Sequence, residues 1–446
     1  MYQLPIHINK DKIFIVNRST IDNRLDAQYY SANLDLSGFI KLSSVAIVKG
    51  GKRIPQGHGY SNEQTPYHYL RVADMDSDAQ VEVNSLMNIS EEVFNILERY
   101  EIFEGELATS IAGTIGKITI LKNIPADKRV ILTENCAKIL AKPNVDLLPE
   151  YLKICLELPI VKKQLDLNYI QTTIPKLGLD KIVGIKLPPI PCMQKQQEIV
   201  DYISEAYTQK RAKEAEAQQL LDSIDGYLLK ELGITIPNVD NGLNNRMFYS
   251  SFSKIEGNRI DPIYSLYFGK NASSTEYENT SLRSIAHIVK GNALSSSDVE
   301  EGNIPVIAGG QTSPYNHSHS NYDGNIITVS ASGAYSGYVW YHDYPIYATD
   351  CCVIYSKDES LFITKYLFEV LKLQQKGIYR LQTGAAQPHV YAVDLQMLNI
   401  PVVSIEKQQK IVDYITNVRT RAEALQKDGK EILKEAKCKV EQVILG

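Results

Sequence analysis

A segment that occurs twice constrains the fold of this chain more than any other feature. The residues KQQEIVDYI at 195–203 recur as KQQKIVDYI at 407–415, with eight of nine positions identical at an offset of 212. Further matches keep the same order, and the earliest of them, IVKG at 47–50 and again at 288–291, has an offset of 241. Self-similarity of this kind indicates one structural unit present in two copies, of which the first is the longer.

Each copy has the pattern of a mixed globular half followed by a long helix. Short β-branched runs, such as KITIL at 117–121 and NIITVSAS at 325–332, lie between Gly, Pro and Asn residues and are typical of strands. Two Pro-free segments, 194–232 and 404–445, carry apolar residues at alternating spacings of four and three, which predicts helices with coiled-coil seams. The predicted seam contains Ile199, Ile203, Ala206, Leu220 and Ile224 in the first helix and Ile411, Ile415, Val418, Leu425 and Ile432 in the second.

These patterns predict an α+β fold in which two globular domains are joined by two long helices. We expect the helices to pack as an antiparallel coiled coil with pseudo-two-fold symmetry. The predicted boundaries are 1–193 and 236–403 for the globular domains, and 194–235 and 404–446 for the helices. Two similar domains at a fixed separation suit a ligand with two sites along a rod, and duplex DNA, with a repeat of about 34–36 Å per turn, is such a rod.

Charge limits how nucleic acid can be bound. The chain has a formal charge of −5, and the four predicted regions carry 0, −3, −4 and +2 in chain order. No region has a broad basic field, so DNA binding must come from local patches or from partner subunits. The 28 Tyr residues, against 9 Phe and a single Trp, favour surfaces where an aromatic ring also needs a polar group.

Other classes of protein receive little support from the sequence. No window approaches the roughly 18 consecutive apolar residues of a membrane span, and the N-terminal residues lack the pattern of a signal peptide. We therefore expect a cytoplasmic protein with no membrane partner. The six Cys residues form neither a disulfide framework nor a zinc-binding pattern.

The motifs in this sequence that resemble those of enzymes are incomplete. The sequence Asp261-Pro262-Ile263-Tyr264 lacks the second Pro of an amino-methyltransferase loop. The segment 113–117 has two residues between its Gly positions where a phosphate-binding loop needs four. The pair His317 and His319 has no accompanying cluster of carboxylates or thiols, so a solvated loop is the better explanation than a metal site.

The doubled helix-entry motif carries a family resemblance. The segments LPPIPCMQKQQEIVDYI at 187–203 and IPVVSIEKQQKIVDYI at 400–415 each lead from a variable half into a long helix. Supporting signatures are RLDAQYY at 24–30, SIAGTIGKITIL at 110–121, SASGAYSGYVWY at 330–341, YATDCCVIY at 347–355 and QTGAAQPHVYAVDL at 382–395. Over nearly its whole length the chain resembles the specificity (S) subunit of type I restriction-modification systems.

The resemblance implies a role and a set of partners. In such proteins each globular half is a target recognition domain that reads one half of a split site in double-stranded DNA, while the helices set the gap and dock two methyltransferase (M) subunits. It further implies that M subunits methylate adenine with S-adenosylmethionine and that motor-nuclease (R) subunits use ATP and Mg. The S subunit then has no reaction and no cofactor of its own.

Candidate DNA contacts follow from the chemistry of readout. Gln, Asn, Arg, Ser and Thr on rigid loops match the edges of bases, whereas Lys and Arg on phosphates give register only. In the first half the candidates are Lys52, Arg53, Gln56, Tyr60, Thr114, Thr172, Thr173 and Lys176; in the second they are Asn292, Ser296, Gln311, Ser313, Tyr315, Tyr335, Thr383, Gln387 and His389. Positions that differ between the halves are the better candidates, because two half-sites usually differ. Gln171 and Gln382, which match, are better explained as scaffold residues.

The sequence therefore predicts a non-enzymatic DNA-recognition subunit, and two alternatives stay open. One is the specificity subunit of a type II enzyme that cuts beside a split site. The other is a coiled-coil adaptor whose two domains bind proteins.

Overall fold

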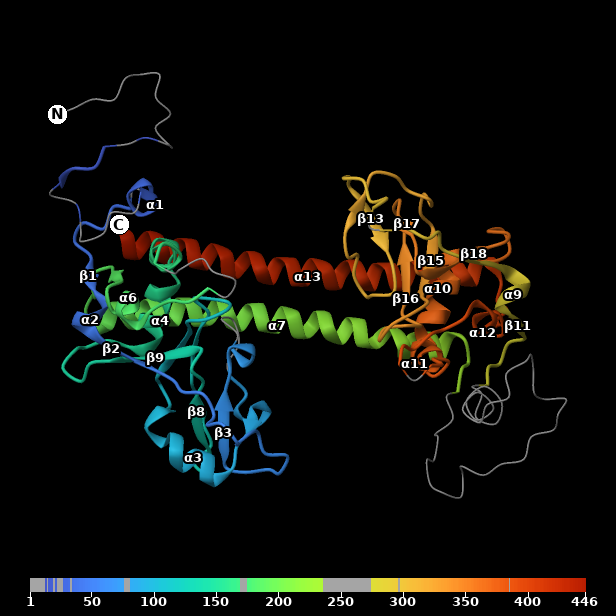
Figure 1. The fold of residues 1–446 in the computed structure, drawn as a ribbon. Coiled ribbons are helices and arrows are strands. Elements are labelled where there is room, and N and C mark those ends of the chain that lie inside the picture. The colour runs from blue at the N-terminus through green and yellow to red at the C-terminus, as the bar shows by residue number, and fades with distance from the viewer. Residues whose placement is uncertain are drawn as a thin grey trace. The chain divides into compact units, whose positions relative to one another are not determined.

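A computed structural model describes residues 13, 15–18, 21, 27–32, 34–75, 81–168, 175–235, 274–295, 297–384 and 386–446. The chain divides into two compact units, the first made of Met1–Arg211 and Gly429–Gly446 and the second of Ala212–Asp428. Two long helices, α7 (Met193–Glu231) and α13 (Ile405–Leu445), each contribute to both units (Figure 1). Among the described helices, none has a stretch that is both long and apolar enough to cross a bilayer.

The core of the first unit is a four-stranded antiparallel sheet of order β2-β9-β6-β7. Its strands are β2 (Ala46–Gly50), β9 (Cys136–Ala141), β6 (Leu107–Ser110) and β7 (Ile118–Ile120). Every residue of β6 and β7 is buried, as expected for strands covered on both faces. A second sheet has the order β4-β3-β8-β5, with β3 (Tyr67–Leu70) parallel to β8 (Arg129–Leu132) and short flanking strands β4 (Met87–Asn88) and β5 (Glu101–Ile102).

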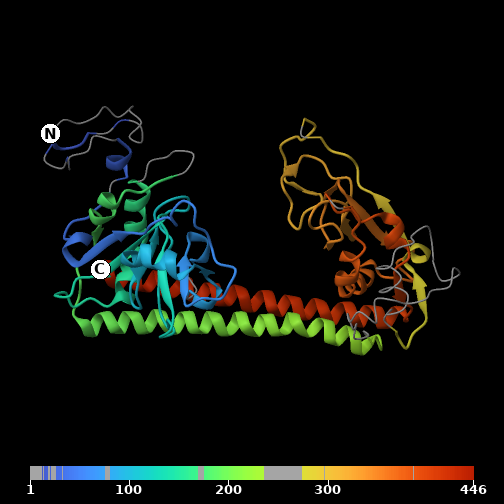
Figure 2. The same cartoon turned by 60° about the horizontal axis from the view of Figure 1, so that its bottom comes forward.

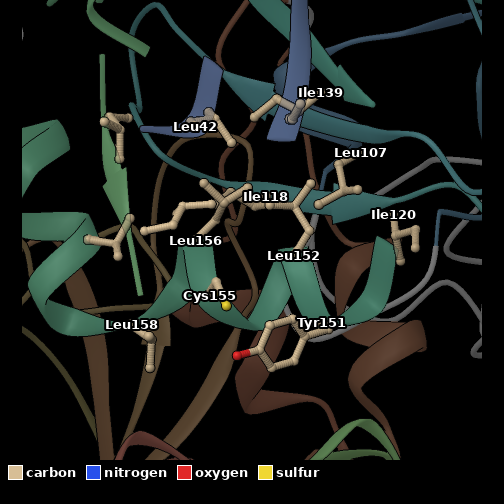
Figure 3. Packing of buried hydrophobic residues seen from close by; sticks show 14 of the residues in the cluster. Leu42, Leu107, Ile118, Ile120, Ile139, Tyr151, Leu152, Cys155, Leu156 and Leu158 are labelled. Atoms are coloured by element: carbon tan, nitrogen blue, oxygen red, sulfur yellow. The ribbon is translucent and has the colours of Figure 1, made fainter. Parts of the chain in front are cut away.

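Short helices cover these sheets. They are α1 (Ala27–Ser31), α2 (Leu42–Val45), α3 (Glu91–Leu97), α4 (Pro149–Glu157), α5 (Pro159–Asp166) and α6 (Leu179–Val183), with 3₁₀ turns η2 (Val72–Asp74), η3 (Val83–Ser85) and η4 (Glu98–Tyr100). Helices α4 and α5 both begin with Pro, which suits a first helical position because its missing N–H has no partner there. The buried face of α4 packs on the sheet, with Leu152 and Leu156 beside Ile118 (Figure 3). A two-stranded pair, β1 (Ile40–Lys41) with β10 (Lys186–Leu187), links the beginning and end of the globular part.

The second unit repeats this plan. Its main sheet has the order β12-β18-β15-β16, all antiparallel, and a smaller sheet has the order β14-β13-β17, with β13 and β17 parallel. The strands are β12 (Ala286–Lys290), β18 (Cys351–Ser356), β15 (Ile326–Ser330), β16 (Val339–His342), β14 (Asn316–His317), β13 (Ile304–Ile307) and β17 (Tyr347–Ala348). Strand β11 (Asn279–Ser281) pairs with β19 (Asn399–Pro401), and the short helices are α9 (Leu282–Ile285), α10 (Thr364–Leu373), α11 (Gln375–Tyr379) and α12 (Ala392–Gln396).

The identical strand order confirms that the chain contains one fold twice. The additional length of the first copy lies mainly between β3 and β6, where α3 and β5 are found. In the second copy the corresponding stretch from β13 to β15, all of it described, contains only the short strand β14.

Strand register corrects one detail of the sequence comparison. Ala46 of β2 pairs with Ala141, and Ala286 of β12 pairs with Ser356, so the equivalent strands are offset by 240 residues. The IVKG match, with its offset of 241, is therefore shifted by one position. The structural counterpart of Gly291 is Gly51 rather than Gly50, because the N–H groups of Gly51 and Gly291 donate to Cys136 and Cys351 at the start of equivalent strands.

The two long helices pack against each other and against the globular core within each unit. In the first unit Ile199 and Ile203 of α7 share a core with Leu433 and Val440 near the end of α13. In the second unit the later part of α7, at Ile224 and Leu228, shares a core with the beginning of α13. The helices are thus antiparallel, as predicted, and lie side by side in both views (Figures 1 and 2).

Most predicted seam positions are buried in these cores. Those below one-tenth exposure are Ile199, Ile203, Ala206, Ile224, Ile411, Ile415 and Val418, whereas Leu220, Leu425 and Ile432 are half-buried. In the second unit the helix pair is reinforced by stacking of Tyr227 on Tyr414, with ring centroids 3.9 Å apart, and by an ion pair between Lys213 and Asp428. The domain boundaries named above stay predictions.

Candidate nucleic-acid interface

Three loops of the first unit meet at one edge of its main sheet. Strands β2 and β6 end at this edge and β9 and β7 begin there, so the loop after β2, the β6–β7 loop and residues 133–135 lie together. A fourth segment joins them, because Lys176 forms a β-bridge with Ala112. The structure therefore brings together the candidates Lys52, Arg53, Thr114 and Lys176, and all four side chains are exposed.

The second unit gathers its candidates at the equivalent edge. His389 forms β-bridges with both Ser332 and Thr383, which places it beside the β15–β16 loop that carries Tyr335. Ser330 donates to the carbonyl of Gly310 at 3.2 Å, so the loop bearing Gln311 lies alongside. The exposed candidates on this side are Asn292, Gln311, Tyr315, Tyr335, Thr383 and Gln387, with Ser313 and His389 half-buried.

A glycine sets the backbone path of the loop after β2 in the first unit and of the loop after β12 in the second. The N–H of Lys52 donates to Leu132 at 2.9 Å and that of Asn292 donates to Ala348 at 3.0 Å, so these two candidates are structural equivalents. A Cβ atom on the preceding residue, Gly51 or Gly291, would overlap the carbonyl oxygens of the neighbouring strand end. Only glycine permits this approach, and it sets the backbone path of both loops.

The remaining candidates have varied positions. Gln56 is exposed on the loop after β2, and the hydroxyl of Ser313 donates to the carbonyl of Tyr315. Gln382 donates to the carbonyl of Ser336 at 2.7 Å, a contact of the kind expected for a scaffold residue. Thr172, Thr173 and Ser296, together with Gln171 and the sequence 261–264, lie outside the described residues.

A polar pocket of about 370 Å³ lies beside the edge loops of the first unit. Two of its lining residues, Arg53 and Tyr60, were predicted as DNA contacts. Its other polar side chains, which sequence reasoning missed, are those of Tyr69, Arg71, Thr133, Glu134 and Asn135. They come from strand ends far apart in the chain, and no local motif marks them.

An ion pair between Arg53 and Glu134 lines the pocket. Nε of Arg53 donates to Glu134 at 2.6 Å, and the hydroxyl of Thr133 donates to the other carboxylate oxygen at 3.0 Å. Burial works to raise the pKa of Glu134, but the hydrogen bonds from Arg53 and from Thr133 outweigh it and lower the pKa below its ordinary value. Burial also raises the pKa of Tyr69 to about 12, so its phenol stays protonated and donates to the carbonyl of Lys52 at 2.7 Å.

Arg71 also lines the pocket, with different hydrogen-bond partners. Its Nε and Nη2 donate to the two carboxylate oxygens of Asp74 at 2.9 and 2.7 Å. The guanidinium carbon lies 5.9 Å from the ring centroid of Tyr60, within the range of a cation–π contact. Arg71 therefore holds Tyr60, whose side chain is 45% exposed, at the rim of the pocket.

The histidine pair of the second unit is part of a loop scaffold. Nδ1 of the buried His317 accepts from the N–H of Glu300 at 3.1 Å, and its ring packs edge-on against Tyr347. Within the described ranges, no group of three or more His, Cys, Asp or Glu side chains is placed to hold a metal ion.

Comparison with known proteins identifies the family. A family model described as "Type I restriction modification DNA specificity domain" matches residues 35–221 and 274–435, which together make up most of the chain. The chain belongs to this family. The two matched ranges are the two copies found in the sequence, and the predicted resemblance to type I specificity subunits is confirmed.

A solved structure from a type I system shares the fold. A chain from a study of complex assembly and conformational transition of the type I system aligns with a TM-score of 0.51 and 14% identity, covering 91% of this chain and 96% of that one. The S subunit from M. genitalium aligns with a TM-score of 0.46 and 14% identity, covering 91% of this chain and 95% of that one. The HsdS subunit from Thermoanaerobacter tengcongensis aligns with a TM-score of 0.36 and 17% identity, covering 92% of this chain and 96% of that one. No curated protein matches the chain.

Proposed function

We propose that the chain is the DNA-recognition subunit of a type I restriction-modification complex and reads a split target with its two units. The observation that carries the proposal is the match to a DNA specificity domain in both copies. Its support in the structure is the placement of exposed polar and cationic side chains on loops at one edge of each sheet. Rigidly held loops of this kind suit readout of base edges.

The proposal assigns chemistry to other chains. Two M subunits dock on the long helices and methylate adenine with S-adenosylmethionine, and R subunits supply ATP- and Mg-dependent translocation and cleavage. The chain itself is non-catalytic and holds no cofactor. We expect the complex to act in the cytoplasm on double-stranded DNA.

Two alternatives use the same architecture. The specificity subunit of a type II enzyme that cuts beside a split site would carry the same two units. A coiled-coil adaptor would use its edge loops to bind proteins, and it is disfavoured because the matching family model describes DNA specificity.

The test is co-expression with the methyltransferase encoded beside the gene, followed by methylation-sensitive single-molecule sequencing of host DNA. We expect methylated adenines confined to one split motif. Replacing residues 45–175 with the corresponding segment of another family member should change one half of that motif and leave the other half as it was.

The alternatives give different results in the same experiment. Motif-linked methylation together with cleavage at a fixed distance from the site, without ATP, would indicate the type II enzyme. An active methyltransferase with no motif-linked methylation would refute DNA recognition and favour the adaptor.

A further inference from the structure

Several polar side chains that line the pocket of the first unit have small or apolar counterparts among the described residues of the second. Because Lys52 corresponds to Asn292, the residue after it, Arg53, corresponds to Ala293. The N–H groups of Thr133 and Thr349 donate to Leu70 and Ile307, which makes these two residues equivalent. Arg71, which follows Leu70, therefore has Ala308 as its counterpart, and the preceding Tyr69 has Val306.

Glu134 is an added residue at this edge. Cys136 and Cys351 follow the two loops, and their N–H groups donate to Thr133 and Thr349. The carbonyl of Asn135 accepts from Ile111 as that of Asp350 accepts from Ala331, so Asn135 and Asp350 correspond. Between Thr133 and Asn135 the first unit thus has one extra residue, and that residue is the partner of Arg53.

Arg71 and Arg53 differ in how many of their N–H donors are bound to a carboxylate of the protein. Arg71 uses both Nε and Nη2 on Asp74. Among the described residues, the Arg53 guanidinium has one hydrogen-bond partner, Glu134, which it contacts through Nε alone. The Arg53 side chain is 77% exposed, whereas that of Glu134 is 28% exposed. The bond to Glu134 therefore fixes the direction of the Arg53 guanidinium, and the two Nη groups of Arg53 are open to a ligand.

We propose that Arg53 reads a guanine in the half-site recognised by the first unit, with Glu134 as the residue that positions it. This inference rests on the proposed function. It adds to it one residue that determines specificity and the base that this residue contacts. Two parallel N–H donors match O6 and N7 of guanine in the major groove, and no other base offers this pair of acceptors. Tyr60 and Asn135 line the same pocket, so the neighbouring base pair is expected to lie against them.

The second unit cannot make this contact, because Ala293 stands in place of Arg53. The two half-sites are thereby expected to differ at this position. Arg53→Lys keeps the charge and replaces the planar, anchored pair of donors with a flexible ammonium, which makes a less directed contact with O6 and N7. It should keep affinity for the DNA backbone and weaken the discrimination between bases.

The experiment uses the complete complex of this chain with its methyltransferase. The motif is first read from wild-type co-expression, and the purified complex is then measured in competition binding against duplexes that carry each of the four bases at every motif position. For Arg53→Ala and Arg53→Lys we expect the preference for guanine at one position to fall by about 5- to 150-fold. Preferences in the other half-site should be unchanged.

Glu134 and a distant lysine supply the positioning test and the control. Glu134→Ala removes the anchor and should weaken the same guanine preference, while Arg53 still contributes its charge to the salt dependence of binding. Lys122→Ala is the matched control, because Lys122 pairs with Glu150 just after β7, at the opposite edge of the sheet. It should leave every base preference unchanged.

The outcomes separate this inference from the proposed function. A wild-type split motif whose base preferences survive both Arg53 variants would overturn the guanine contact and leave DNA recognition standing. A wild-type complex without any motif would overturn both. Thermal unfolding of each variant beside the wild type checks the fold, and Arg53→Lys decides the question if Arg53→Ala proves unstable.

Discussion

Gln196 and Gln408, 212 residues apart, make the same set of three hydrogen bonds in the two units. Each is fully buried at the start of a long helix. The side-chain oxygen of Gln196 accepts from the N–H of Leu148, and its nitrogen donates to the carbonyls of Asp146 and Pro191. Gln408 binds Ile363, Leu361 and Val403 in the same way. The repeated KQQ motif is thus a clamp that ties a long helix to the beginning of α4 or α10.

Removing one clamp should destabilise its unit. Gln408→Ala removes three hydrogen bonds, to the N–H of Ile363 and the carbonyls of Leu361 and Val403, so we expect the free energy of unfolding to fall by about 2–4 kcal/mol. Denaturant unfolding followed by circular dichroism measures the change. The control is Gln409→Ala, because Gln409 is exposed and its side chain donates to Asp413 within its own helix. Equal losses for the two variants would contradict the clamp.

Replacing the edge glycines, Gly51 and Gly291, with alanine should lower the free energy of unfolding. Gly51→Ala and Gly291→Ala force a Cβ against backbone carbonyls that have no room to move, and overpacking of this kind costs about 1–3 kcal/mol. Both variants should lower the melting temperature and weaken readout of the affected half-site. Gly59→Ala provides the comparison, since a Cβ there meets no atom within 4 Å. A normal melting temperature for Gly51→Ala would refute the close approach.

The stability of the second unit should depend on the ionisation of His342. This side chain is fully buried, its Nε2 lies 2.8 Å from the Thr328 hydroxyl, and burial lowers its pKa to about 4. Below pH 6.5 the unfolded chain takes up a proton at this histidine that the folded chain does not bind. The contribution of His342 to the free energy of unfolding is therefore fully present above pH 6.5 and is lost as the pH falls toward 4. The loss amounts to about 3 kcal/mol.

A variant isolates this contribution. His342→Gln places an amide nitrogen near the position of Nε2 and does not titrate. The difference in unfolding free energy between wild type and variant, measured from pH 8 to pH 4, should therefore follow the histidine alone. A difference that stays constant with pH would show that His342 titrates normally in the folded protein.

Charge predicts how the chain binds DNA without partners. With a net charge of −5 it lacks the field needed to hold the phosphate backbone. We expect the isolated chain to bind more weakly than about 1 μM at physiological salt, and the complex with methyltransferase subunits to bind at about 10 nM or tighter with a steep salt dependence. Filter binding measures both, and specific nanomolar binding by the chain alone would refute the prediction.

More of the fold than of the candidate site could be predicted from the sequence. The repeated segment and the long helices could be predicted because a long identical segment and a sustained apolar spacing leave few alternatives, whereas the hydrogen bonds of the clamp could not. The IVKG match is one residue out of structural alignment because β2, a five-residue strand, takes its register from β9, some 90 positions later in the chain. A four-residue identity carries too little information to set it.

The polar pocket of the first unit illustrates the same limit. Arg53 and Tyr60 were chosen by residue type and position on a loop, but Glu134 is 81 residues from Arg53 and belongs to no motif. Its significance depends on an insertion of one residue that only the hydrogen bonds around it reveal. Which candidates contact DNA stays a prediction for every residue named.

The edge glycines also bear on how such a protein changes over generations. Gly51 and Gly291 hold the backbone against the neighbouring strand through main-chain contacts, and the side chains that follow, Lys52 and Asn292, differ. Substitution at the second position therefore alters the chemistry presented to a ligand without altering where the loop runs. We therefore expect single substitutions at Lys52 or Asn292 to change what the loop contacts while the unit keeps its fold.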